Sequence, residues 1–415
     1  MTTMKMAPVG DDRSPELDVI RGFALFGVML INLYGHYEFA IPAAVLDGLV
    51  TAPVDRPLGW VFDVFLSGKA QALFSMLFGF GLPMFLSRAE ARGADGMRLY
   101  LRRLSILLVI GFAHALAVFF GDILHIYALT AFILILFRRA PDRFLLLCGL
   151  AFSLLAGLAM TLHLAWAEAA TGTTPALTVA LEAGNARRWI VFMAGDYPAY
   201  VAEMWHSMGA EWFLSVFAWS YIGTVLGRFL MGYWLFRKEW LMRPAAHAAG
   251  FRRWAPRLIG AGLAFSLADD AIGASDFEPG VAAQAVLEIV HRIGQLTLAL
   301  GYGAGLVVLM QSSWARKLLS GLGDVGRMAL TNYLTQSLVY LFVFYGFGLG
   351  LIRYGGALTC LGIAVVTFGL QIVFSRWWLA RFRFGPLEWL WRSATYGQWQ
   401  PFRAPRAFEP KATAS

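Results

Sequence analysis

One aspartate and two histidines lie close together in the sequence and have the chemistry of an oriented general base. His114 lies about 9 Å before the expected end of one apolar segment at residue 120, and His125 lies one turn into the next. Asp122 stands between them at a helix N-cap position, where a carboxylate accepts hydrogen bonds from free backbone N–H groups. The helix dipole favours neutral His125, which can accept a proton. The pattern predicts a proton-transfer site, or histidines that only bond neighbouring helices.

The first apolar segment adds an amide and a third histidine. Asn32 and His36 are one turn apart on one face, near the predicted outer end of that segment. An amide N–H can donate to the oxyanion of a tetrahedral intermediate. If these apolar segments cross a membrane, we expect Asn32 and the three histidines to converge in its outer third.

A stripe of polar residues occurs in a later apolar segment. Its four members share one helical face because they stand at offsets of 0, 3, 4 and 7 residues. The stripe is either an internal strip of ion pairs that fixes neighbouring helices or the wall of a polar cavity. In both cases we expect it to face protein or water and not lipid. Its members are Glu288, His291, Arg292 and Gln295.

Four further polar residues complete the candidate substrate-binding set. Lys69 follows Asp63 closely, so the lysine could pair with it or extend to the membrane interface. Asn332 and Gln336 stand one turn apart and could join helices or line a cavity. Arg21 belongs to a basic set at the predicted inner ends, which normally marks topology and anionic lipid but could also bind a phosphate-bearing donor. The other members of this set are Arg102, Arg103, Lys317, Arg327, Arg376, Arg381 and Arg383.

The segments that carry these residues are mostly long enough to cross a membrane as helices. Of the 415 residues, 59% are apolar and 14% are charged, where a soluble domain has roughly half and a quarter. The alternating pattern of barrel strands is missing, so we predict an all-α, polytopic integral membrane protein with about ten transmembrane helices. The predicted spans are 17–36, 69–87, 104–120, 122–137, 143–165, 212–236, 257–272, 284–310, 325–347 and 356–380.

Basic residues are distributed unevenly between the connections. Only Arg56, Arg187, Arg188 and Arg353 fall in the predicted outer segments, whereas most other arginines and lysines fall in inner ones. Because basic residues near span ends resist translocation, we expect both termini to be cytoplasmic.

The spans divide the chain into four parts. Residues 1–165 form a first transmembrane region of five spans, and residues 166–211 form an outer connection whose aromatic second half is expected to be an interfacial lid or hairpin. Residues 212–392 form a second region of five spans that ends in a membrane-surface helix, and residues 393–415 form a cytoplasmic tail. An inverted repeat of the transporter type is not visible in the sequence.

The cysteines and the net charge point to no metal, disulfide or nucleic acid. Cys148 and Cys360 both lie inside apolar segments, where small buried side chains are expected. The net charge of +8 arises largely from basic residues between spans, which act as orientation signals.

Several motifs resemble those of the YeiB-like bacterial membrane proteins. The resemblance covers nearly the whole chain outside residues 166–210, and it implies a multi-pass protein of the bacterial cytoplasmic (inner) membrane. The motifs are LDVIRGFALFG (17–27) with Asn32, LFGFG (77–81), GFAH (111–114), GDIL (121–124), GRMALTNY (326–333) with Gln336, and FGPLEWLWR (384–392).

The opening Leu-Asp-x-x-Arg-Gly motif with a downstream asparagine is also similar to the transmembrane acyltransferases that include heparan-α-glucosaminide N-acetyltransferase. This similarity implies a cytoplasmic acyl-CoA donor, an acceptor on the far side, and an asparagine and a histidine at the reacting centre. Asn32 matches that asparagine. The histidine of that family lies further beyond the asparagine than His36 does here, so His36 and His114 both remain candidates.

We therefore expect an integral-membrane acyltransferase that uses acyl-CoA and no metal. His114 or His125, oriented by Asp122, would be the base, and Asn32 or Arg292 would stabilise the oxyanion. The expected partners are membrane lipids, the acyl donor and a small-molecule, glycan or lipid acceptor, and a homodimer is left open. The alternatives are a transporter or lipid flippase that uses the polar stripe as a relay, and a structural or signalling protein without turnover.

Overall fold

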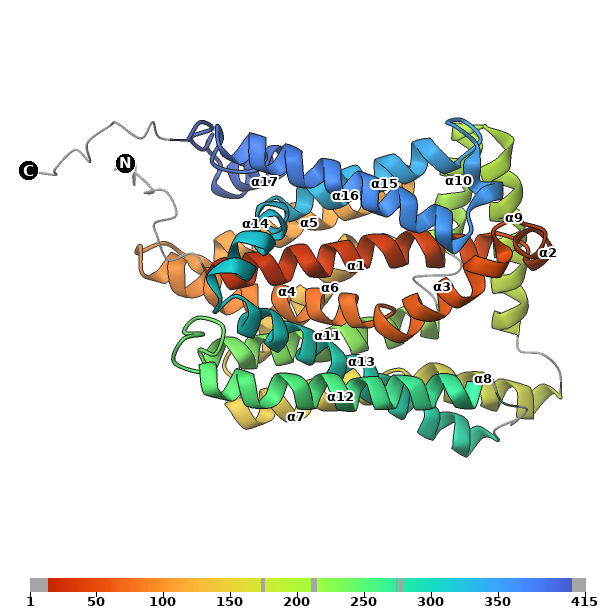
Figure 1. The fold of residues 1–415 in the computed structure, drawn as a ribbon, viewed down its shortest axis with the longest axis horizontal. Coiled ribbons are helices and arrows are strands. Elements are labelled where there is room, and N and C mark those ends of the chain that lie inside the picture. Colours follow the sequence, from red (N-terminus) through yellow and green to blue (C-terminus); the bar gives the residue numbers. More distant parts are fainter. Residues whose placement is uncertain (1–13, 173–175, 210–214, 274, 276–279, 405–415) are drawn as a thin grey trace, which may run out of the picture.

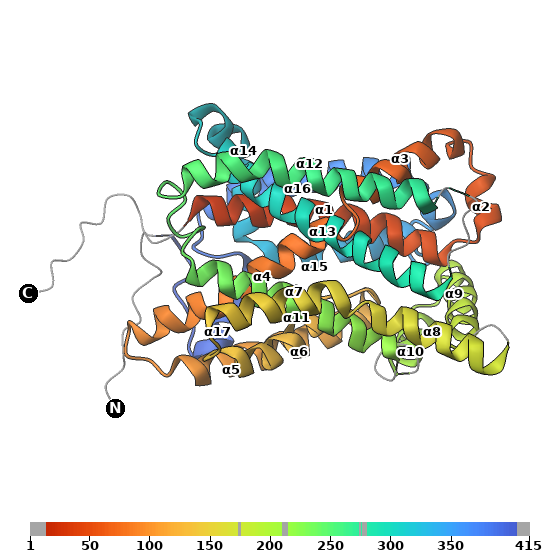
Figure 2. The same ribbon diagram turned by 90° about the horizontal axis from the view of Figure 1, so that it is seen from below.

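The computed structural model describes residues 14–172, 176–209, 215–273, 275 and 280–404. Most helices run side by side along the long axis of the molecule (Figure 1 and Figure 2), and the described residues form no strand beyond an isolated bridge between Phe382 and Arg403. The α-helices are α1 (Pro15–Ala40), α2 (Ala43–Asp47), α3 (Ala52–Phe65), α4 (Lys69–Glu90), α5 (Gly96–Ala117), α6 (Leu124–Leu134), α7 (Asp142–Leu155), α8 (Leu158–Thr171), α9 (Ala176–Ala194), α10 (Tyr197–Ser207), α11 (Val216–Arg237), α12 (Ala248–Gly273), α13 (Val281–Leu309), α14 (Ser313–Arg327), α15 (Ala329–Phe344), α16 (Ala357–Leu379) and α17 (Pro386–Tyr396).

Six helical segments in the described part of the chain are long and apolar enough to cross a membrane. Two shorter apolar helices, Leu124–Phe137 and Ala329–Phe344, accompany them. The chain is thus an all-α membrane protein. The six segments are Pro15–Gly35, Ala52–Glu90, Gly96–Ala117, Asp142–Thr171, Val281–Leu309 and Ala357–Leu379.

Four predicted spans differ clearly from the helices in the structure. The span at 104–120 corresponds to α5, Gly96–Ala117, and the span at 325–347 is interrupted at Met328, between α14 and α15. The span predicted at 143–165 is divided at Gly157 into α7 and α8. An added Cβ at Gly157 would collide with the carboxylate of Glu288, so a glycine here lets the polar stripe of α13 approach closely. Helix α12 begins at Ala248 instead of 257, because exposed arginines continue the helix beyond its apolar part.

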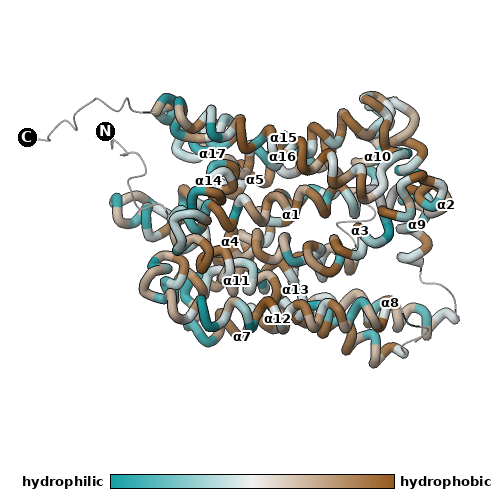
Figure 3. Tube along the Cα trace, in the orientation of Figure 1, coloured by the Kyte–Doolittle hydropathy of each residue, from teal (hydrophilic) through white to brown (hydrophobic). Residues whose placement is uncertain are grey.

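The outer connection folds into helices. Figure 1 shows α9 and α10 running across the end of the bundle opposite α17. At that other end, α17 lies where a membrane-surface helix is predicted after the last span. Figure 3 shows hydrophilic residues concentrated at this end, while apolar residues fill the middle of the bundle. Trp212, in the predicted interfacial segment, lies outside the described residues.

Glycines allow the central helices to pack closely. An added Cβ at Gly79 of α4 would collide with the backbone of Phe229 on α11, and one at Gly232 would collide with the backbone of Met76. The ring of buried Tyr127 contacts Phe229 with centroids 5.1 Å apart. The core therefore lies between α4, α6 and α11, where these glycines let the helix backbones approach closely.

Candidate functional site

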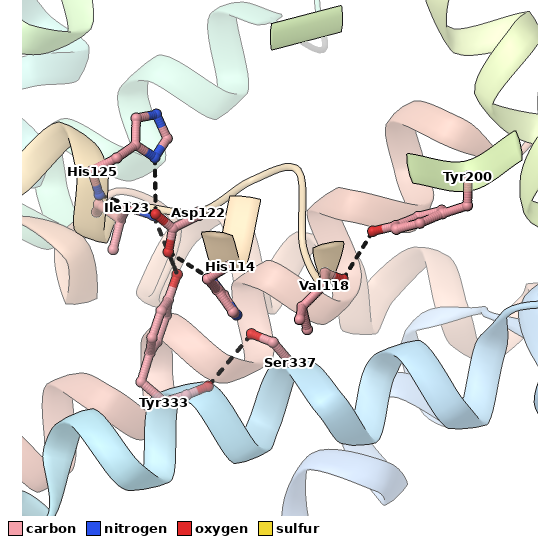
Figure 4. Close-up of polar contacts among 8 residues, drawn as sticks. All are labelled: His114, Val118, Asp122, Ile123, His125, Tyr200, Tyr333 and Ser337. Atoms are coloured by element: carbon pink, nitrogen blue, oxygen red, sulfur yellow. Dashed lines mark hydrogen bonds and ion pairs between the residues drawn. The ribbon is translucent and has the colours of Figure 1, made fainter. Parts of the chain in front are cut away.

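Asp122 lies between the two histidines and bonds to both (Figure 4). Its Oδ1 is 2.8 Å from His114 Nδ1, and its Oδ2 is 2.8 Å from His125 Nδ1. The His125 backbone N–H donates to Oδ2 over 3.0 Å, so the carboxylate serves a free N–H at the start of α6 as predicted. The N-cap residue itself is Ile123, one position after Asp122. All three side chains are at most 3% exposed, so bulk water is excluded from the cluster.

The Asp122 cluster fixes the protonation pattern of its histidines. An ionised carboxylate only accepts hydrogen bonds, so each ring donates its Nδ1–H and keeps a lone pair on Nε2. His114 Nε2 is buried and has no hydrogen-bond partner among the described residues. A buried acceptor without a partner is costly, and it calls for a functional explanation. The arrangement presents His114 Nε2 as a base, with Asp122 placed to stabilise the imidazolium. No group of three or more His, Cys, Asp or Glu side chains in the described residues could hold a metal ion.

Tyr333 of α15 is the fourth member of the cluster. Its hydroxyl donates to Asp122 Oδ1 over 3.3 Å and accepts from the Ile123 N–H over 3.2 Å. Its ring lies 5.5 Å from the imidazole of His114 between centroids. Tyr333 is not among the site residues predicted from the sequence, where its only signal is its place in the GRMALTNY motif.

The turn between α5 and α6 brings the histidines to one carboxylate. Helix α5 ends at Ala117, where the carbonyl of His114 accepts from the Val118 N–H over 2.9 Å. His114 therefore lies in the last turn of α5, closer to its end than the predicted 9 Å, because the helix stops short of residue 120. An added Cβ at Gly111 would collide with the backbone of His125, so this glycine permits the close approach of α5 and α6.

Helices α9 and α10 cover this turn from the end of the bundle opposite α17. Tyr197 Oη donates to the Ala117 carbonyl over 2.8 Å, and Tyr200 Oη donates to the Val118 carbonyl over 2.9 Å (Figure 4 shows the second bond). Both carbonyls are left free by the end of α5, so the tyrosines satisfy groups that a helix terminus would otherwise expose. The α9–α10 pair thus forms a cover over the Asp122 cluster.

A cavity of about 370 Å³ extends from the basic end of the bundle to Ile123 and Tyr333, beside Asp122. Asp122, His114 and His125 themselves are not among the residues that line it. Its middle is lined by apolar side chains of α4 and α5, including Phe78 and Leu104. Its far end is lined by Ile123 and Tyr333, which bond to each other and, through Tyr333, to Asp122. Six arginines line its basic end, namely Arg21, Arg88, Arg92, Arg103, Arg327 and Arg392.

The sequence has relatives that share nearly its full length. Residues 235–398 match the family described as protein of unknown function (DUF418). The chain is 33% identical to uncharacterized protein YxaH of Bacillus subtilis (strain 168), across 94% of this chain and 96% of the relative. It is 31% identical to uncharacterized protein YeiB of Escherichia coli (strain K12), across 92% and 96% respectively. The chain belongs to the DUF418 family. No solved structure matches it.

The C-terminal motif of this DUF418 protein closes the basic end of the cavity. The guanidinium of Arg103 lies 3.5 Å from the ring centroid of Trp391, whose indole N–H donates to the Arg103 carbonyl over 3.0 Å. Glu388 Oε1 accepts from the Leu330 N–H over 2.7 Å and caps the start of α15. Burial raises the pKa of the Glu388 carboxyl, while hydrogen bonds from Thr331 and the backbone oppose the shift. These contacts fix α17 against α5 and α15.

The stripe on α13 forms a second polar network in the DUF418 protein. His291 Nδ1 lies 2.7 Å from Asp269 Oδ2 of α12, and His291 Nε2 lies 2.8 Å from Gln295 Nε2. Gln295 Oε1 in turn accepts from Arg228 Nη2 of α11 over 2.9 Å. A continuous chain of hydrogen bonds therefore runs from the half-exposed Asp269 to the buried Arg228.

Asp269 and Arg228 are the members of this network that the sequence prediction omits. Arg228 is the buried one. Its side chain is buried near the middle of α11, and the available signal was a lone charge inside an apolar segment. Arg292 Nε and Glu288 Oε1 form a separate ion pair of 2.7 Å, next to Gly157 at the break between α7 and α8. The stripe thus contacts α8, α11 and α12.

Two predicted substrate-binding residues join helices. Asn332 Nδ2 donates to Ser375 Oγ over 3.1 Å, and Gln336 Nε2 donates to Gln371 Oε1 over 2.9 Å. These contacts connect α15 to α16, and neither residue lines the cavity beside the Asp122 cluster. Of the two interpretations of their spacing, the contacts favour the one in which they fix helices.

The other predicted residues occupy separate places. Lys69 Nζ donates to the Asp63 carbonyl over 2.7 Å and is buried beside the α13 network. Arg21 lines the basic end of the cavity and pairs with Asp18 at 3.0 Å. Asn32 is half-buried on α1, and its amide makes no hydrogen bond with the described residues. His36 lies in the last part of α1, but its side chain is outside what the structure describes.

Proposed function

We propose that this protein is an integral-membrane acyltransferase that moves an acyl group from a cytoplasmic acyl-CoA to an acceptor at or beyond the outer face. The observation that carries the proposal is the cavity that joins six arginines to Tyr333 beside Asp122. Arginine forks bind phosphate groups bidentately, and the apolar middle of the cavity suits the uncharged arm and acyl group of the donor. The sulfur and carbonyl of the thioester would then lie at the cluster end.

The proposed reaction uses His114 as the base. Its Nε2 accepts the proton of an acceptor hydroxyl or amine while that oxygen or nitrogen attacks the thioester carbonyl. The tetrahedral intermediate then releases the CoA thiolate, which takes the proton from the imidazolium. Asp122 keeps Nδ1 protonated and stabilises the imidazolium in between.

Asn32 is the proposed donor to the oxyanion, because its amide has no partner among the described residues. One turn before it, the Met29 carbonyl accepts from Tyr340 Oη over 3.0 Å. The Tyr340 ring contacts Phe119, in the turn that carries Asp122, with centroids 6.0 Å apart. Arg292 is less suited to this role because it is paired with Glu288.

The activity is tested by thiol release. Purified protein in liposomes is expected to release CoA thiol slowly from acetyl-CoA, with water taking the place of the acceptor and acetate as the other product. His114→Ala should lower the rate by about a hundredfold or more, the usual scale for a general base. His163→Ala is the matched control because His163 lies on α8, away from the cluster. Thermal midpoints show that each variant is folded. A folded His114→Ala protein with the wild-type rate would rule out the proposal.

We further propose ten spans with both termini cytoplasmic in the bacterial inner membrane. The start of α1 and helix α17 lie at one end of the bundle (Figure 1), and arginines line the cavity there, as the positive-inside rule requires. In intact cells, a membrane-impermeant thiol reagent should label a cysteine placed at the exposed Trp205 and leave one at Arg243 unlabelled. Labelling of position 243 from outside would overturn this topology.

A transporter or lipid flippase is the second candidate. The hydrogen-bonded chain from Asp269 through His291 and Gln295 to Arg228 favours it, because intramembrane ionisable groups mark ion and substrate pathways. If His114→Ala keeps acyl transfer while Arg228→Met abolishes substrate flux in proteoliposomes, this second function replaces the first.

A further inference from the structure

A second cavity of about 350 Å³ lies between α4, α11, α12 and α13, and the proposed acyl transfer does not use it. Its lining is almost wholly apolar and includes the indoles of Trp234, Trp240 and Trp254. Gly303 and Ala304 on α13 lack bulky side chains and leave the space open. The cavity has the size of a small-molecule site, but it offers few polar groups to fix a polar ligand.

The rim of this cavity is basic. The guanidinium carbons of Arg253 and Arg257 each lie 5.9 Å from the ring centroid of Trp254. Trp254 is 51% exposed, and within the described ranges neither arginine has a carboxylate partner. Tryptophan beside unneutralised arginine is typical of the level where acyl chains meet lipid headgroups.

We propose that this cavity binds one acyl chain of an anionic phospholipid from the inner leaflet, with the lipid phosphate against Arg253 and Arg257. The apolar lining takes up methylene groups and excludes water, which favours a hydrocarbon chain over a polar ligand. The positive charges of the two arginines attract a negatively charged headgroup, and each guanidinium group can donate two parallel hydrogen bonds to phosphate oxygens.

The lipid site shares a wall with the basic cavity. Leu77 of α4 lines both cavities. In the loop after α11, Leu241 lines the apolar cavity and the next residue, Met242, lines the basic cavity. A bound acyl chain therefore supports the α4 wall of the basic cavity from behind.

The headgroup contact is tested with lipids of identical acyl chains. The full-length protein is reconstituted into vesicles of phosphatidylglycerol or of phosphatidylcholine, and its thermal midpoint is measured in each. We expect a midpoint several degrees higher in phosphatidylglycerol, since a ligand that binds only the folded state stabilises it. The double variant Arg253→Gln with Arg257→Gln should lose this difference. Arg143→Gln, at an exposed basic residue on α7 that lines neither cavity, is the control and should keep it.

The chain contact is tested separately by filling the cavity. An added Cβ at Gly303 meets only the side chain of Leu73, at 3.3 Å, so Gly303→Leu places its bulk in the cavity. Gly305→Leu on the same helix is the control because Gly305 does not line the cavity. Native mass spectrometry should detect one phosphatidylglycerol retained by the wild type and Gly305→Leu, and none by Gly303→Leu.

Two results would overturn the lipid site. One is a double arginine variant that keeps the full difference between the two lipids. The other is a folded Gly303→Leu protein that retains phosphatidylglycerol as the wild type does. If Gly303→Leu does not fold, the arginine variants decide the question alone.

Discussion

In two aspartate–histidine pairs of this protein a carboxylate oxygen is bonded to a histidine Nδ1, but the surroundings of the two pairs differ. Asp122 and Asp269 each lie within 2.8 Å of a histidine Nδ1. The first pair, with His114, is 3% and 0% exposed in its side chains, whereas the second, with His291, is 37% and 28% exposed. His291 Nε2 is bonded to Gln295, but His114 Nε2 has no partner within the described chain. A histidine whose Nε2 has no hydrogen-bond partner can accept a proton from a substrate, whereas one whose Nε2 is already bonded only links its neighbours. The partner of Nε2 therefore distinguishes the two pairs more than the aspartate–histidine bond does.

The two pairs also differ in what lies next to them: a cavity beside the Asp122 pair, and a chain of hydrogen bonds beside the Asp269 pair. Tyr333, which donates to Asp122, lines the same cavity as six arginines. The α13 network instead leads to Arg228, a buried charge held by an amide oxygen. A cavity brings a substrate to a base, while a chain of satisfied hydrogen bonds holds helices together or carries charge. The proposed acyl transfer therefore belongs to the Asp122 cluster, whereas the α13 network fixes helices or conducts charge.

The largest effect should come from exchanging each aspartate for asparagine. In Asp122→Asn the amide N–H can donate to a histidine Nδ1 and move the ring proton to Nε2, which removes the base. We expect acyl transfer to fall about a hundredfold or more, measured as the initial rate of CoA thiol release. Asp269→Asn should keep the wild-type rate. Equal losses in both variants would erase the distinction between the two pairs.

An intermediate effect is expected on stability in the α13 network. Glu288→Gln leaves the Arg292 guanidinium without its anion in a half-buried site, which should lower the free energy of unfolding by about 2 kcal/mol. The exposed pair of Asp142 and Lys238 provides the control, and Asp142→Asn should change stability by less than about 1 kcal/mol. Thermal and denaturant unfolding in detergent measure both. Unaltered stability together with lost acyl transfer would move Glu288 into the reacting site.

The smallest effect should come from Tyr333→Phe. The variant removes one donor to Asp122 and the acceptor of the Ile123 N–H, each worth about 1 kcal/mol. We expect acyl transfer to fall between about two- and tenfold. Tyr340→Phe is the matched control on the same helix, because among the described residues the Tyr340 hydroxyl donates to the Met29 carbonyl and not to Asp122. A hundredfold loss in Tyr333→Phe would make this hydroxyl a direct participant in the reaction.

Much of the fold follows from the local sequence. Long apolar segments must satisfy their backbone groups internally, so Lys69–Glu90 and Val281–Leu309 form helices close to the predicted spans. The position of Asp122 before α6 and the shared face of the α13 stripe are likewise local properties, because capping and helical periodicity depend on neighbours within a few residues.

The members of the site depend on contacts that no local pattern specifies. Tyr333 reaches Asp122 from more than two hundred residues away, and Arg228 reaches Gln295 from a different helix. Asn332 and Gln336 looked equally suited to a cavity wall, yet their helix turns them toward α16. The sequence by itself determined an all-α membrane protein and the pairing of Asp122 with its nearby histidines. Only the tertiary structure decided which Nε2 lacks a partner and where the arginine-lined cavity ends, because both depend on how distant helices pack around one turn.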